Sequence, residues 1–335
     1  MRITKDLLIS TAKDTVKRRT FGGSGDLVCA YITGSLTFDD PLIGGTTDID
    51  MIFVHSLETE QRREIVQVAD DFHLDISHFP QSAFSHPRDL RSDAWLGGFL
   101  CHYPIVIEDK NHWFDYVRSG VFAHFFQPSN ILSRVRPFAE AARKSWMDLN
   151  MRQPEDHHNS MKVYIQIIKD AANAIACLTS VPLTDRRFLI DFPARAEAVN
   201  MPGLAGGLAD LLLPTDPVEP EWETWAQSWD SAWSSYQQIS NPSLSFSPCR
   251  QSYYKKAIMG LSETNSQAAF WILLRTWSIM AAALPFNGVS QKGFNDVLSL
   301  MMLDEKNFSD RLESLDMFLD VVEEAIDKWQ SAAGL

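Results

Sequence analysis

The hydrophobic pattern of this chain changes at about residue 112, and that change limits the folds it can adopt. Before it, short runs rich in Val, Ile and Phe alternate with turn residues and helical segments, as in a sheet flanked by helices. After it, apolar residues recur at spacings of three and four, which is typical of amphipathic helices. The sequence therefore predicts an α+β fold, with a small mixed sheet and its helices over residues 1–111 and an all-helical domain over 112–335.

Four extended segments are predicted in the first part. They are LVCAYIT (27–33), DIDMIFV (48–54), FHLDISHF (72–79) and PIVIE (104–108). Helices are predicted over residues 4–20 and 57–70, and the first of them ends before a glycine-rich breaker run at 22–25.

The helical part has three clear amphipathic patterns and two breaks. The patterns lie near residues 131–149, 165–175 and 308–329. The breaks are PTDPVEP (214–220) and NPSLSFSP (241–248), because proline cannot continue a helix. Residues 268–284 are the most apolar stretch, but Arg275 at their centre costs roughly 2.5 to 3.5 kcal/mol on membrane insertion. We therefore expect a buried bundle helix there, and no membrane partner.

The net charge and the cysteine content limit which partners the protein can bind and which cellular compartment it is expected in. The net charge is −13, which disfavours DNA as a partner because nucleic-acid affinity rests on neutralising phosphates with Lys and Arg. The four cysteines form no CxxC pair, and the amphipathic, charged N-terminus does not resemble a secretion signal. A cytoplasmic protein is expected.

The residues that indicate chemistry begin at the end of the first predicted strand. Gly34 and Ser35 follow that strand, and Asp48 and Asp50 open the second one after twelve intervening residues. Strand residues two apart point to the same face, so the two carboxylates can share divalent cations. A glycine-serine turn offers backbone N–H groups and a hydroxyl to a phosphate. The pattern indicates a magnesium-phosphate site.

A third carboxylate, Asp75, lies in an apolar setting in the next predicted strand, where an uncompensated charge would be costly. If that strand neighbours the second, Asp75 completes a cluster able to hold two metal ions. His73 and His78 flank it at an odd spacing, so they point to opposite faces and suit packing or surface roles better than joint metal binding.

These motifs together resemble the DNA polymerase β-type nucleotidyltransferase superfamily, with most likeness to antibiotic (aminoglycoside) nucleotidyltransferases. The resemblance covers residues 26–79. It implies transfer of a nucleoside monophosphate from an NTP, such as ATP, to a hydroxyl with two Mg²⁺ ions. Gly34, Ser35 and Thr47 would then contact the nucleotide, Asp48 and Asp50 both metals, and Asp75 the catalytic metal and the acceptor proton. The loop FDDPLIGGTT (38–47) is longer than the turn usual in that superfamily.

The helical part adds two groups of candidates, each with an ordinary alternative. Lys255 and Lys256 lie in a basic aromatic cluster that could contact the triphosphate, with Lys162 as a second choice; a surface patch is the alternative. Glu221, Trp222, Glu223 and Trp225 lie in an acidic interval, 196–249, that has no Lys, Arg or His. They could form a wall for a cationic acceptor, or a helix with a packed aromatic face and a solvated acidic face.

The expected function is nucleotidyl transfer to a small acceptor, such as a cationic aminoglycoside-like compound, at a site between the two domains. The first alternative is modification of a tRNA end or a protein side chain, as in toxin-type or regulatory nucleotidyltransferases. The second is a non-catalytic nucleotide-binding module. The sequence leaves these alternatives open, because acceptor and nucleobase are selected by contacts that linear spacing does not reveal.

Overall fold

The computed structural model describes residues 3–335 apart from 23–24, 39, 153–155, 214–219 and 286–288. The chain divides into two compact units, Met1–Asn130 and Ile131–Leu335. The division falls later than the expected junction at about residue 111, because the helix Trp113–Phe125, which follows the sheet, packs within the first unit. The expected α+β class, a mixed sheet followed by a helical unit, is confirmed.

The first unit is built on a five-stranded sheet with the order β3-β4-β2-β1-β5. Its strands are β1 (Leu27–Thr33), β2 (Thr47–His55), β3 (Arg63–Gln67), β4 (Phe72–Pro80) and β5 (Ile105–Asp109). The sheet is mixed, since β2 and β4 run parallel while the other neighbouring pairs are antiparallel. The four predicted strands are confirmed within two residues at each end.

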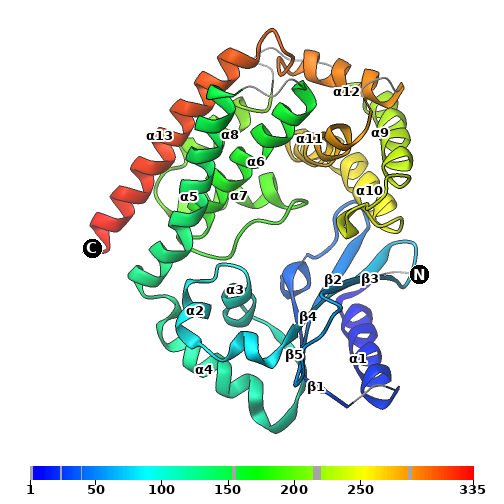
Figure 1. Cartoon of the computed structure of the whole chain (residues 1–335), viewed down its shortest axis with the longest axis vertical. Helices are drawn as coiled ribbons and strands as arrows, with labels where there is room; N and C mark the ends of the chain where they lie inside the picture. Colours follow the sequence, from blue (N-terminus) through cyan, green and yellow to red (C-terminus); the bar gives the residue numbers. More distant parts are fainter. Residues whose placement is uncertain (1–2, 23–24, 39, 153–155, 214–219, 286–288) are drawn as a thin grey trace. The chain divides into compact units, whose positions relative to one another are not determined.

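Helices cover both faces of this sheet (Figure 1). On one face α1 (Lys5–Gly22) packs through Leu8, Ala12 and Val16 against alternate residues of the strands. On the other lie α2 (Pro87–Ser92), α3 (Leu96–Cys101) and α4 (Trp113–Phe125). Short 3₁₀ turns occur at Gly34–Thr37, Gln81–Phe84 and Lys110–His112. The candidate site lies on the face of the sheet that α2 to α4 cover.

The helix predicted over 57–70 is wrong, because residues 63–67 form strand β3 instead. This strand pairs antiparallel with β4, and the two form a hairpin closed by backbone hydrogen bonds from Val68 and Ala69 to Phe72. Glu, Arg and Gln are good helix formers, but intrinsic propensity is small in free energy, so the ladder to a neighbouring strand overrides it.

The second unit consists of helices, nine of them in the part of the chain that the structure describes. They are α5 (Pro128–Met151, which begins in the first unit), α6 (His157–Ala176), α7 (Phe188–Ala198), α8 (Gly203–Asp210), α9 (Trp222–Tyr236), α10 (Arg250–Ser262), α11 (Ser266–Ala283), α12 (Val289–Leu300) and α13 (Phe308–Ala332). Helix α11 contacts α6, α7, α9, α10 and α12, so it lies at the centre of the bundle. The predicted break at 241–248 is confirmed, while most of the one at 214–220 lies outside the described residues.

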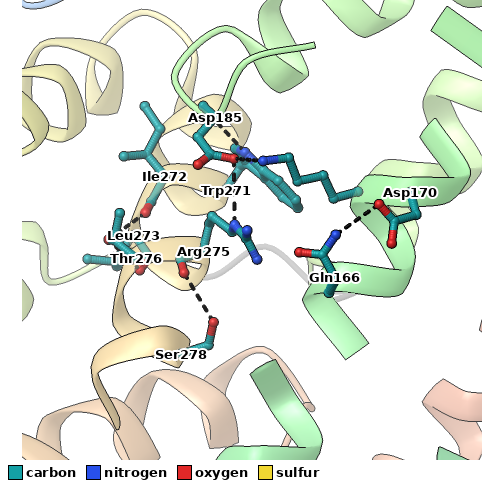
Figure 2. Close-up of polar contacts among 10 residues, drawn as sticks. Gln166, Asp170, Asp185, Trp271, Ile272, Leu273, Arg275, Thr276 and Ser278 are labelled. Carbon is teal, nitrogen blue, oxygen red and sulfur yellow. Dashed lines mark hydrogen bonds and ion pairs between the residues drawn. The ribbon is translucent and has the colours of Figure 1, made fainter. Parts of the chain in front are cut away.

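The charge in the apolar helix α11 is compensated inside the bundle (Figure 2). Arg275 lies 3.5 Å from Asp185, whose carboxylate also accepts a hydrogen bond from Lys169 at 2.5 Å. Burial alone would raise the pKa of Asp185, but Lys169 and Arg275 outweigh it and hold the pKa below its usual value. Trp271 donates to the backbone carbonyl of Asp185 at 2.9 Å. Among the described residues, no helix is long and apolar enough to cross a membrane.

Candidate metal and nucleotide site

The parallel pair β2 and β4 brings three carboxylates together on one face of the sheet. Asp50 lies directly opposite Asp75 in the register, and Asp48 is two residues before Asp50. All three project to the face covered by α2 to α4, because they alternate with residues that pack against α1. One ligand oxygen from each lies within 4.8 Å of the others. That geometry can hold divalent cations.

Burial distinguishes these carboxylates from ordinary surface acids. Asp48 and Asp75 are 7% and 6% exposed, and Asp50 is half-buried. Three hard oxygen donors without sulfur or imidazole suit Mg²⁺, or the similar Mn²⁺. The residues present therefore fit the metal that the sequence led us to expect.

The glycine turn after β1 is built against the second aspartate. Gly34 has φ of +70°, and a Cβ added there would come 1.9 Å from Oδ2 of Asp50. Both the backbone conformation and this contact require glycine. The turn is closed by Thr37, whose hydroxyl donates to the Gly34 carbonyl at 2.8 Å. Gly34 therefore sets how closely the chain approaches the carboxylates.

Ser35 and Thr47 lie together beside the carboxylates. Their hydroxyl oxygens are 3.4 Å apart, Ser35 is half-buried, and Thr47 is fully buried. The Thr47 hydroxyl also donates to the Asp48 carbonyl at 3.2 Å. Thr47 is thus placed to orient Ser35, and Ser35 is the more accessible of the two predicted nucleotide contacts.

Arg63 is a member of this site that the sequence analysis missed. It lies on β3, and its guanidinium donates to both oxygens of Asp75, from Nε at 2.8 Å and from Nη2 at 2.6 Å. Because the segment was assigned to a helix, its side chains could not be placed beside β4. The signal available was the β-branched pair Ile65-Val66 before the acidic turn at 70–71.

The two predicted lysines lie on α10, in the second unit. Lys255 lies 2.5 Å from Asp230 of α9, and Gln251 donates to the other oxygen of that carboxylate at 2.9 Å. Lys256 is exposed. Both lysines line a hollow of about 440 Å³ with Asp230, Pro248, Gln251, Ser252 and Met259. A phosphate contact by Lys255 would therefore compete with Asp230.

The proposed aromatic wall on α9 is packed inside the bundle instead. Trp225, Trp229 and Trp233 are buried, and Trp222 is half-buried against Phe270, with ring centroids 4.5 Å apart. A wall needs exposed ring faces, and Trp225 has none to offer, so its substrate role is corrected. Glu221 and Glu223 are exposed to solvent. The alternative that the sequence left open, a packed aromatic face and a solvated acidic face, describes this helix.

No protein-family model and no curated protein sequence matches this chain. Among solved structures, the chain is similar to a nucleotidyltransferase-like protein from Exiguobacterium sibiricum 255-15. The match covers 94% of this chain and 91% of that chain, with 9% sequence identity and a TM-score of 0.34.

Proposed function

We propose that this chain is a metal-dependent nucleotidyltransferase, which moves a nucleoside monophosphate from an NTP to an acceptor hydroxyl. The proposal is carried by one observation, the convergence of three carboxylates from two parallel strands beside a glycine turn. Two of the three are more than nine-tenths buried. Buried carboxylates are costly unless a cation or hydrogen bonds compensate for their lost hydration. Arg63 contributes to this at Asp75, and a metal ion shared by the three carboxylates would add to it.

Asp48 and Asp50 are the proposed ligands of two Mg²⁺ ions, and Asp75 is the proposed third ligand of one of them. Bound there, Mg²⁺ would neutralise charge on the triphosphate and activate the acceptor hydroxyl. The backbone of Gly34 and the hydroxyl of Ser35 are the proposed contacts of the β- and γ-phosphates, with Thr47 holding Ser35. Lys255 and Lys256 remain proposed phosphate contacts. To bind a phosphate, Lys255 would give up its ion pair with Asp230.

The proposed reaction is an in-line displacement at the α-phosphorus. The acceptor oxygen forms a bond to this phosphorus while its bond to the oxygen bridging to the β-phosphate breaks, and pyrophosphate leaves. Asp75 is the proposed recipient of the proton that the hydroxyl loses. In transfers of this kind the protein contributes mainly positioning and charge stabilisation, which rigid strands are well suited to provide.

We place a small cationic compound, such as an aminoglycoside, first among the acceptors. The net charge of −13 attracts cations and disfavours polyanions. The exposed carboxylates Glu221 and Glu223 are proposed contacts of an acceptor amine, whereas the buried Trp225 no longer is. The described cysteines are free thiols, which supports the proposed cytoplasmic location.

The experiment is a screen for pyrophosphate release by the full chain with Mg²⁺, each NTP and a panel of amine-bearing acceptors. Asp48→Asn and Asp50→Asn should lower the rate roughly 10²–10³-fold, because each removes charge from the metal site. Asp14→Asn, an exposed aspartate on α1, is the matched control and should keep the parental rate. Equal rates in all of these proteins would contradict the proposal.

Two other outcomes separate the alternatives. Label transferred from NTP to RNA or protein of a cell extract, with no product in the small-molecule panel, would indicate a tRNA or protein acceptor. NTP binding that persists in Asp75→Asn, with no pyrophosphate released by the parent and any acceptor, would indicate a non-catalytic nucleotide-binding module.

A further inference from the structure

Arg63 engages the same atoms that a metal ion would need. Nε of its guanidinium donates to Oδ1 of Asp75 and Nη2 donates to Oδ2, so both oxygens of that carboxylate accept a hydrogen bond. Bidentate pairs of this kind are stronger and more directional than single contacts. Asp75 is nearly buried, while the Arg63 side chain is 37% exposed. The ion pair therefore spans the boundary between the carboxylate cluster and solvent.

The charges of these four side chains suit one divalent ion better than two. Three carboxylates and one guanidinium leave two negative charges, which a single divalent cation balances. A second cation on Asp75 would lie beside the guanidinium, and like charges at such distances repel strongly where water is scarce. Two ions become favourable only when Arg63 leaves Asp75 or when more negative charge arrives.

We propose that Arg63 is a gate on Asp75, which keeps the site in a one-ion state until the guanidinium is released. This inference rests on the proposed function, since it takes Asp48, Asp50 and Asp75 as metal ligands. Arg63 acts through Asp75 and is a positioning residue. The triphosphate of an incoming NTP brings the negative charge that both the guanidinium and a second cation require, so NTP and the second ion bind together.

The strand that carries Arg63 is anchored independently of its guanidinium. Glu64, the next residue, points to the opposite face, where it lies 2.6 Å from Arg19 of α1 and 3.0 Å from His78 of β4. β3 is also an edge strand, so one of its sides has no neighbouring strand within the sheet. Because the Arg63 side chain is 37% exposed and Glu64 anchors the strand on its other face, Arg63 can turn toward solvent while the backbone of β3 keeps its place.

The test is a titration of the full chain with Mn²⁺ alone, followed by electron paramagnetic resonance, which reports free and bound Mn²⁺ without any turnover. The parent should bind one Mn²⁺ tightly. Arg63→Gln should bind a second Mn²⁺ at a free Mn²⁺ concentration at least about tenfold lower than the concentration at which the parent binds its second ion. A change of this size is typical when a side chain hydrogen-bonded to a metal ligand is altered. Arg62→Gln is the matched control, because it removes the same charge from the adjacent exposed residue. Arg63→Lys keeps the charge with a single contact and should fall between parent and Arg63→Gln.

Each outcome decides one claim. If the parent and Arg63→Gln bind Mn²⁺ with the same stoichiometry and affinity, or Arg63→Gln binds it more weakly, the gate is wrong while the proposed function stands. If the parent binds no Mn²⁺ even with an NTP present, the proposed function fails as well. Should Arg63→Gln not fold, the same comparison is made with Arg63→Lys, which must bind the second ion more readily than the parent for the gate to hold.

Discussion

At Gly34, both the backbone conformation and the position of a proposed metal ligand, Asp50, depend on the absence of a side chain. Its positive φ costs another residue about 1–2 kcal/mol, and its missing side chain leaves the space that Oδ2 of Asp50 occupies. The aspartate would have to turn away from any Cβ placed there. Gly34 therefore contributes to function by leaving room for a carboxylate, in addition to any contact with phosphate.

Gly34→Ala should lower both stability and activity, whereas Gly45→Ala should lower stability alone. Gly45 also has a positive φ, of +73°, but a Cβ there meets nothing within 4 Å. We expect Gly45→Ala to lose about 1–2 kcal/mol of unfolding free energy, and Gly34→Ala to lose at least as much together with most of its Mn²⁺ binding. Urea unfolding and Mn²⁺ titration of both variants check this. Unchanged Mn²⁺ binding in Gly34→Ala would refute the proposed role of this glycine.

The sequence was informative about these residues where strand periodicity governs them. Asp48 and Asp50 had to share a face, and the placement of Asp75 followed once its strand was put beside β2. Arg63 could not be found in this way, because its contact with Asp75 depends on a hairpin that was assigned to a helix. A contact between side chains on two different strands is not encoded in the hydrophobic periodicity of either strand.

At the scale of elements, the strands and long helices were predictable, and the exceptions depend on neighbours. β3 is half-exposed along most of its length and carries charged residues, so it has neither the apolar run nor the clean alternation of a typical strand. Its pairing with β4 decides its structure. For α9 the sequence left a packed helix and a ligand wall both open, and the bundle decides between them, because Trp225 and Trp229 contact α11.

The packing role of α9 predicts a large difference between two of its tryptophans. Trp229 is fully buried and donates to the Thr276 hydroxyl of α11 at 2.9 Å, whereas Trp222 is half-buried at the start of the helix. Trp229→Ala should cost about 3–5 kcal/mol of unfolding free energy, and Trp222→Ala clearly less. Urea unfolding of the second unit, followed by hydrogen exchange of its peptides, measures both. Equal losses would contradict this account of the helix.

At the scale of the whole molecule, the two units differ in how burial has shifted their titrating groups. In the first unit, burial lowers the pKa of His78, and its hydrogen bond to Glu64 only partly restores it; His55 and Arg19 lower it further. In the second, burial lowers the pKa of His157 but raises those of Asp170 and Asp191. The compact units could be foreseen from the change in hydrophobic pattern, but these shifts could not, because they depend on which side chains become buried together.

Both units should lose stability when the pH falls from about 7.5 to 5.5, because each holds a histidine whose pKa is lowered by folding. A histidine whose pKa is lowered by folding binds protons more readily in the unfolded chain, so stability falls as pH drops through about 6.5, by roughly 1.4 kcal/mol for each pH unit by which the pKa is lowered. The raised pKa values of Asp170 and Asp191 act in the opposite direction, because the folded state then binds protons more readily, and this effect grows as the pH falls further toward the ordinary carboxyl range. Hydrogen exchange under increasing urea, read from peptides of each unit at three pH values, measures both slopes. His78→Gln, which keeps a donor near Glu64 but does not titrate, should flatten the slope of the first unit and leave that of the second unchanged; a steep slope that survives this substitution would assign the acid sensitivity to other groups.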